Sequence, residues 1–170
     1  MPYCPKCDME FVEGITVCTD CGGPLVESKE AALALQAAEK EKREQEMRLR
    51  YEEMQKAAEK LRKEFGVKLA MVTMGSRGAY LSNEKAAAWA VCPHVKPVDT
   101  TGAGDIFGGS AVSMLLRTGK APEELDEKEL AAIGAFASAA ASLSTETPGG
   151  IPSIPPEEEV LKKLRESENA

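Results

Sequence analysis

The second half of the sequence predicts an α/β fold in layers, and three observations support this. A largely apolar run at 67–74 has the character of a buried strand and ends at the glycine-rich segment 75–78. Short apolar segments at 79–82 and 86–92 follow as two further strands. Alanine-rich or amphipathic segments at 104–117, 126–144 and 157–165 then predict three helices. This order is typical of helices layered on a sheet.

Length and composition limit what the chain can be. Its 170 residues allow one domain or two small ones, and 43% hydrophobic but only 5% aromatic residues predict an aliphatic core. The formal net charge of -7, without a basic stripe, argues against a nucleic-acid partner. The sequence has no apolar run long enough to span a membrane and no signal-peptide pattern, so we expect no membrane association and a cytoplasmic location.

Four of the five cysteines form two CxxC pairs near the N-terminus. Cys4 and Cys7 make the first pair, Cys18 and Cys21 the second. Two such knuckles complete a tetrahedral site of four sulfurs, which suits Zn²⁺. The segment resembles a small zinc ribbon, with a short hairpin expected at 11–17. So few residues cannot bury a core, and a structural zinc ion would supply the folding energy. A redox dithiol pair and an iron–sulfur site are the alternatives.

Residues 27–65 contain neither glycine nor proline and are rich in helix-forming residues, which predicts one long charged helix with Ser28 as its N-cap. Apolar side chains recur on one stripe of its second half, at Met47, Tyr51, Met54, Ala58, Leu61 and Phe65. The stripe predicts either a coiled coil that dimerises the chain or packing on the domain that follows. Because a strand follows at once, packing on that domain is favoured for residues 55–65.

The segment 99–109 reads as a glycine-rich turn that runs into a helix. Small residues let backbone N–H groups approach a ligand closely, and a helix N-terminus favours an anion. Asp105 places a carboxylate beside this turn. A phosphate site with an adjacent base is the arrangement that phosphoryl transfer needs. The alternative is an ordinary tight turn with an acidic residue in the first helical turn.

Residues 57–163 resemble the C-terminal third of a PfkB/ribokinase-type carbohydrate kinase, most closely the fructokinase branch. Three blocks carry the resemblance in the expected order: GVKLAMVTMGSRGAYL, VDTTGAGDIFGG and TPGGIPSIPP. DTTGAGD is the most specific of them. The resemblance implies a partial ribokinase-like fold that transfers phosphate from ATP, with Mg²⁺, to a sugar hydroxyl.

The resemblance also implies roles for individual residues. Asp105 would be the catalytic base, and the N–H groups of Gly102, Ala103 and Gly104 would form the anion hole. The nucleotide would contact Thr73, Gly75, Ser76, Gly78 and Ser138. Ser138 departs from the asparagine that family members often carry near the adenine. A monovalent cation, usually K⁺, would be held by Asp99, Thr101, Ser144, Thr147, Gly149 and Ser153.

The sequence therefore predicts three parts: a zinc ribbon at 1–26, a charged helical linker at 27–56 and a kinase C-terminal segment at 57–170. The sugar-binding residues, the β lid and the Asn-x-x-Glu motif of the family have no counterpart before residue 57. An incomplete sheet leaves an edge and an apolar face for a partner chain, or for a second copy joined through the helix. Two alternatives to a truncated kinase stay open: a non-catalytic binding or assembly protein with a kinase remnant, and a fusion artefact.

Overall fold

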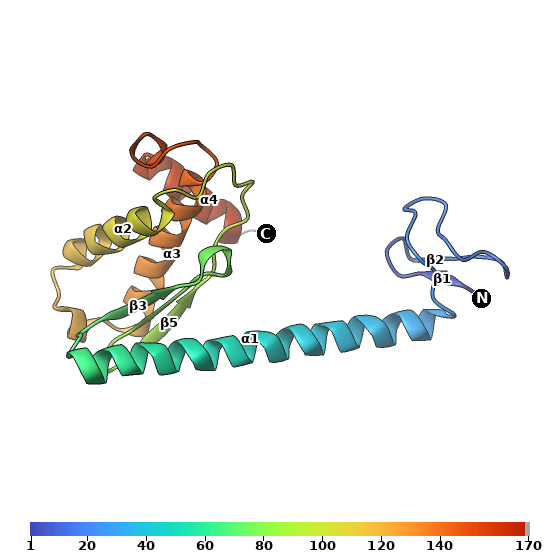
Figure 1. The fold of residues 1–170 in the computed structure, drawn as a ribbon, viewed down its shortest axis with the longest axis horizontal. Coiled ribbons are helices and arrows are strands. Elements are labelled where there is room, and N and C mark those ends of the chain that lie inside the picture. Colours follow the sequence, from blue (N-terminus) through green and yellow to red (C-terminus); the bar gives the residue numbers. More distant parts are fainter. Residues whose placement is uncertain (169–170) are drawn as a thin grey trace. The chain divides into compact units, whose positions relative to one another are not determined.

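The computed structural model describes residues 1–168, which form two compact units (Figure 1). The first unit extends to Glu52 and the second begins at Glu53. The long helix α1, Lys29–Phe65, contributes its first part to one unit and its last part to the other. The prediction of a single uninterrupted helix here is confirmed. Among the described residues, no helix is both long and apolar enough to cross a membrane.

The first unit begins with a two-stranded antiparallel ribbon, β1 (Tyr3–Cys4) and β2 (Met9–Glu10). The prediction of a hairpin at 11–17 is wrong. A turn does form at Gly14, which has a φ of 95°, but the segments on either side of it do not pair with each other. The antiparallel strand pairing instead involves residues before this turn. The backbone around the first cysteine pair reverses the chain and aligns β1 with β2.

Helix α1 starts where its cap was predicted. The Ser28 hydroxyl accepts a hydrogen bond from the backbone N–H of Ala31 at 3.2 Å, as an N-cap does. Ion pairs between residues four apart, such as Lys40 with Glu44, run along the exposed part of the helix. This composition suits a solvated helix.

The second unit is built on a three-stranded antiparallel sheet in the order β3-β4-β5. Strand β3 spans Ala70–Thr73, β4 spans Ala79–Ser82 and β5 spans Ala87–Ala90. All three predicted strands are present, each within the predicted range. A short 3-10 helix η1, Gly75–Arg77, turns the chain from β3 into β4.

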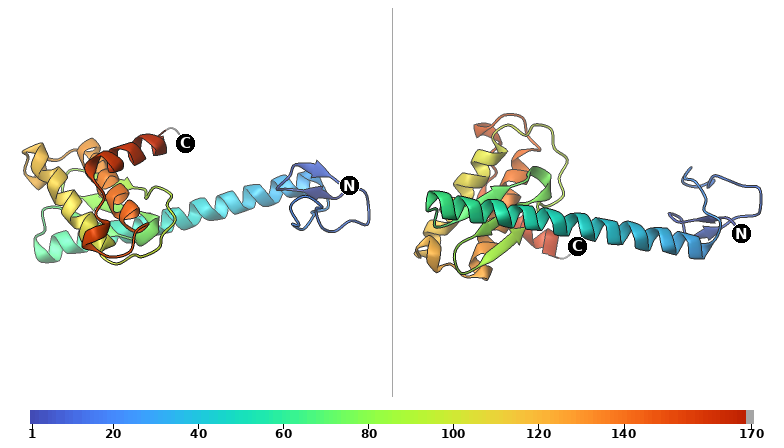
Figure 2. Two further views of the ribbon diagram at one scale, coloured as in Figure 1. Left: turned by 90° about the horizontal axis from the view of Figure 1, so that it is seen from above. Right: turned by 60° about the horizontal axis from the view of Figure 1, so that its bottom comes forward.

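Each face of the sheet is covered by a helix (Figures 1 and 2). On one face, Ala58 and Met54 of α1 pack against Tyr80 and Trp89. Packing of the α1 stripe on the following domain is thus confirmed for these positions, whereas Phe65 remains 71% exposed. The other face carries the main core, in which Leu81 packs with residues of the helices α2 and α3.

Three helices complete the second unit: α2 (Ala103–Thr118), α3 (Glu127–Ser144) and α4 (Glu157–Glu168). Two further 3-10 turns, Pro122–Glu124 and Ile151–Ser153, precede α3 and α4. Asp126 caps α3 in a reciprocal pair with Glu129, which satisfies two backbone donors. A second cluster, including Ile106, Phe136 and Val160, joins α2, α3 and α4. These contacts fix the start of α2 above the sheet.

Asn83 ties the end of β4 to the loop before α3. Its side chain is 3% exposed and donates to the carbonyls of Pro122 and Leu125, both at 2.9 Å. Its Oδ1 accepts from the N–H groups of Lys85 and Ala86 at 2.9 and 2.8 Å. One buried amide therefore uses both its donors and its acceptor to close the β4–β5 turn.

Candidate functional site

The glycine-rich turn before α2 depends on the conformation of Gly102. This residue is the N-cap of α2 with φ 79° and ψ -2°. This left-handed backbone conformation is strained for residues other than glycine. A Cβ here would also lie 3.2 Å from the Cα of Gly150. Both observations explain why the turn carries glycine at this position.

The start of α2 presents backbone donors beside a carboxylate. The first N–H groups of an α-helix have no intrahelical acceptor, and the helix dipole adds partial positive charge there. In this turn Ala103 donates to Thr100 at 3.3 Å, whereas Gly104 and Asp105 occupy the exposed first turn. A Cβ at Gly104 would meet no atom within 4 Å. The turn is therefore open to an anion from outside.

One cleft of about 460 Å³ extends from this turn over the β3–β4 turn; we call it the sheet-side cleft. Its wall includes Ala103 and Gly104 of α2. It also includes every residue for which the sequence implied a nucleotide contact: Thr73, Gly75, Ser76, Gly78 and Ser138. The fold thus brings residues from three separate segments to one hollow of nucleotide size.

Gly78 lets two strands approach closely at the floor of the sheet-side cleft. Its φ is 112°, and a Cβ would lie 2.2 Å from the carbonyl oxygen of Ala90. No side chain fits that space. The position requires glycine for backbone packing, whatever the cleft binds.

Ser138 contributes an unsatisfied polar group to the same cleft. It is 2% exposed, and its Oγ has no hydrogen-bond partner within residues 1–168. Buried hydroxyls are nearly always hydrogen-bonded, so an unpaired one in a cleft wall indicates a place for a polar ligand atom or water.

A second cleft, of about 450 Å³, lies on the other side of the α2 N-terminus; we call it the helix-side cleft. Gly102 and Asp105 line it together with residues of α3 and α4 and the loop around Ile151. Successive residues of one turn therefore face two hollows. Ala103 and Gly104 border the sheet-side cleft, whereas Gly102 and Asp105 border the helix-side cleft.

Asp99 fastens the turn to the segment after α3. Its two carboxylate oxygens accept from the N–H groups of Thr101 and Gly149, both at 2.9 Å. Hydrogen bonds from Gly149, which contribute most, and from Thr101 stabilise the carboxylate and lower the pKa of Asp99 to about 2. The N–H groups of Val98 and Asp99 donate in turn to the carbonyl of Thr145 at 2.7 and 3.0 Å.

The other residues that the resemblance implies as cation ligands have no hydrogen bond to Asp99 among those found in the described residues. The hydroxyls of Ser144 and Ser153 donate to the nearby carbonyls of Ala141 and Gly150, each at 2.8 Å. Thr147 is exposed. The structure thus joins Asp99, Thr101 and Gly149 directly, and their role with a cation stays a prediction.

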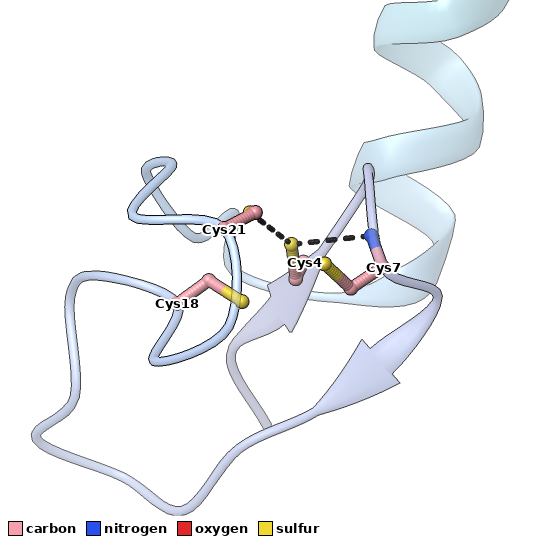
Figure 3. A group of neighbouring side chains, drawn as sticks. All are labelled: Cys4, Cys7, Cys18 and Cys21. Atoms are coloured by element: carbon pink, nitrogen blue, oxygen red, sulfur yellow. Dashed lines mark hydrogen bonds between the residues drawn. The ribbon is translucent and has the colours of Figure 1, made fainter.

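The four N-terminal cysteines converge in the first unit (Figure 3). Their sulfur atoms all lie within 4.8 Å of one another, and those of Cys4 and Cys21 are 3.6 Å apart. A tetrahedral zinc site with Zn–S bonds of about 2.3 Å has sulfurs about 3.8 Å apart. The arrangement is therefore close to the size that a tetrahedral metal ion needs.

The two cysteine knuckles share one backbone pattern. The N–H of Asp8 donates to the carbonyl of Cys4 at 3.0 Å, and that of Gly22 donates to the carbonyl of Cys18 at 2.9 Å. Asp8 and Gly22 both have positive φ, 54° and 67°. This repeat turns the sulfurs of each pair toward the same point.

Crowding alters the acidity of the thiols. The neighbouring side chain of Cys21 raises the pKa of Cys7 to about 12. The backbone N–H of Cys21 lowers the pKa of Cys18 to about 7. Four thiols this close ionise together only with difficulty, unless a cation offsets the charge.

Two residues of the sheet-side cleft were not predicted from the sequence. Cys92 is half-buried and lines the cleft. His94 lines it as well. Both belong to the irregular segment between β5 and the turn, where no periodicity indicates which side chains face the hollow.

Two clefts meet at a glycine-rich helix N-terminus with a carboxylate at the junction, which is the kind of arrangement that phosphoryl transfer needs. Comparison with known proteins specifies the family. Residues 27–157 match the pfkB family of carbohydrate kinases, and the chain belongs to this family.

The chain is similar to ribokinase from Arabidopsis thaliana, with 38% identity over 117 residues that make up 68% of this chain and 28% of the relative. It is also 38% identical to fructokinase-1 from Zea mays over 102 residues, 59% of this chain and 31% of the relative. The structure of Arabidopsis thaliana ribokinase complexed with ribose and ATP matches with a TM-score of 0.50 and 36% identity, over 61% of this chain and 31% of that one. The predicted partial ribokinase-like fold is confirmed. The chain spans about 30% of the length of these relatives.

Proposed function

We propose that this chain carries the ATP-binding and phosphoryl-transfer part of a sugar kinase, in which Asp105 takes the proton from the sugar hydroxyl. The observation that carries the proposal is the position of the α2 N-terminus between two clefts. ATP would lie in the sheet-side cleft, with its γ-phosphate at Gly104. The sugar hydroxyl would approach Asp105 from the helix-side cleft.

Each group at the turn would have a distinct role. The N–H groups at the start of α2 would stabilise negative charge on the transferred phosphoryl group. Mg²⁺ bound together with ATP would offset the negative charge of the phosphates. A monovalent cation such as K⁺ near Asp99 would add positive charge beside the turn. The similarity to a ribokinase that binds ribose and ATP supports ATP as the donor and a sugar as the acceptor.

Release of ADP with a panel of pentoses and hexoses tests the proposal. The wild type should release ADP in the presence of one or more sugars, and Asp105→Asn should lower the rate at least about 100-fold. Asn has nearly the same shape but does not accept the proton. Equal rates for the two proteins would contradict the role of Asp105. ATP binding without sugar-dependent turnover would favour a non-catalytic binding protein instead.

We propose separately that the four cysteines hold a structural Zn²⁺. The sulfur spacing supports this, and so does the small core of the first unit, whose buried apolar residues are Tyr3, Cys4, Cys18 and Ala32. The wild type should contain about one zinc ion per chain, and Cys18→Ser should lose it. Because the second unit has its own core, a chelator should unfold the first unit and leave the second unfolding transition in place. A wild type purified with zinc that contains no metal would contradict the proposal.

We also propose that α1 can join two copies of the chain, but fewer positions of its apolar stripe are available for this than the sequence suggested. Met54 and Ala58 of the predicted stripe pack inside the second unit, so they are not available to a coiled coil. Met47, 64% exposed, and Tyr51, 41% exposed, are the stripe positions of the first unit. Light scattering of the wild type and of Met47→Glu would detect a dimer that depends on this surface.

A further inference from the structure

Cys92 places a thiol in the wall of the sheet-side cleft. The side chain is half-buried, and its Sγ lies 3.3 Å from the carbonyl oxygen of Gly75. Gly75 opens the η1 turn, and it lines the same cleft together with Ser76 and Gly78. The thiol is therefore in contact with the backbone of the segment that would lie along the nucleotide.

A second observation marks the same hollow as a ligand site. The Ser138 hydroxyl, 2% exposed, has no hydrogen-bond partner within the described residues, and Ser138 lines the same cleft as Cys92. The cleft, about 460 Å³, has room for one ligand of nucleotide size. A group of many atoms attached to Cys92 would occupy space that the nucleotide needs.

We infer that Cys92 is a thiol-modification site at which a mixed disulfide with a small thiol and ATP exclude each other. This inference rests on the proposal that the sheet-side cleft binds ATP. It adds a redox-dependent control to that cleft, through a residue that has no part in phosphoryl transfer.

The chemistry requires only a low-molecular-weight disulfide as co-reactant. The Cys92 thiolate attacks one sulfur of the disulfide and forms a new S–S bond, and the other half leaves as a thiolate that takes up a proton. The disulfide is reduced to one free thiol as Cys92 is oxidised. An excess of free thiol reverses the exchange and reopens the cleft.

The other cysteines differ from Cys92 in their environment. Cys4 and Cys18 are each 1% exposed, and all four cluster in the first unit, where the proposed zinc ion would hold their sulfurs. Cys92 belongs to the second unit and is not part of that cluster. Glutathione disulfide should therefore select Cys92 in the zinc-loaded chain.

The experiment uses the full zinc-loaded chain, glutathione disulfide as the probe and Cys92→Ser as the matched control. Peptide mass spectrometry locates the adduct, and calorimetry measures ATP binding before and after the reaction. The adduct should form at Cys92, and the modified protein should bind ATP at least about tenfold more weakly. ATP at about ten times its Kd should slow the modification about tenfold, because about one tenth of the cleft remains free. ATP binding by Cys92→Ser, compared with its own untreated reference, should not change with glutathione disulfide.

The outcomes separate the two proposals. Unchanged ATP affinity after modification at Cys92, or an adduct on the CxxC cysteines of the zinc-loaded chain instead, would overturn the inference while leaving the ATP site intact. Absence of ATP binding by the reduced wild type would count against the proposed function, and the inference would fall with it.

Discussion

Replacing Gly102 by alanine tests whether the turn before α2 has the conformation described. Alanine in the left-handed region costs about 1–2 kcal/mol, and its Cβ would come within 3.2 Å of the Cα of Gly150. The two effects together predict a loss of about 2 kcal/mol, a factor of about thirty in the equilibrium constant of unfolding. For a unit of this size the thermal midpoint should fall by about 8 °C.

Gly104→Ala is the matched control, two residues along the same turn. A Cβ at Gly104 meets no atom within 4 Å, and alanine favours helix, so stability should hold or rise by about 0.5 kcal/mol. The new methyl would nevertheless border the sheet-side cleft, so ATP binding should weaken. Thermal unfolding and ATP titration of both variants provide the comparison. A Gly102→Ala protein as stable as Gly104→Ala would refute the description of the turn.

Three further substitutions test the fold around the site. Leu81→Ala removes a fully buried side chain between the sheet and α3 and should cost about 2–5 kcal/mol in urea unfolding. Asn83→Ala leaves the carbonyls of Pro122 and Leu125 without their donor, and urea unfolding should show a loss of about 3 kcal/mol in stability. A loss below about 0.5 kcal/mol would contradict the structural role of Asn83. Asp99 has its pKa lowered to about 2, so its contribution to stability is present above about pH 4 and is lost as pH falls toward 2. The urea midpoint of the wild type should accordingly fall more steeply between about pH 5 and pH 2 than that of Asp99→Asn, and parallel curves would contradict this.

Local patterns were enough to predict the main elements of the second unit. Apolar strand runs punctuated by glycine, and alanine-rich helices, depend on neighbours in sequence. Strand β4 was predicted with the bounds that the structure has, Ala79–Ser82. The nucleotide contacts were implied by resemblance, and the structure gathers all five residues in one cleft.

Features that depend on distant contacts were not predictable in this way. Asn83 reads as an ordinary turn residue, but its amide is held by carbonyls about forty positions later in the chain. The first-unit hairpin was misplaced because the β1–β2 pairing is set by the backbone of the cysteine knuckle, rather than by a turn signal such as Gly14. The position of Cys92 in the cleft wall depends on an irregular segment, which carries no period.

We propose that a phosphoryl group passes, at the start of α2, from ATP in the sheet-side cleft to a sugar in the helix-side cleft. Direct detection of the sugar phosphate by mass spectrometry, after incubation with Mg²⁺, ATP and a sugar, tests it most directly. The wild type should produce a phosphorylated sugar, and Asp105→Asn should produce at least about 100-fold less while it keeps its ATP affinity and thermal midpoint. Equal amounts of sugar phosphate from the two proteins, or none from a wild type that binds ATP, would contradict it.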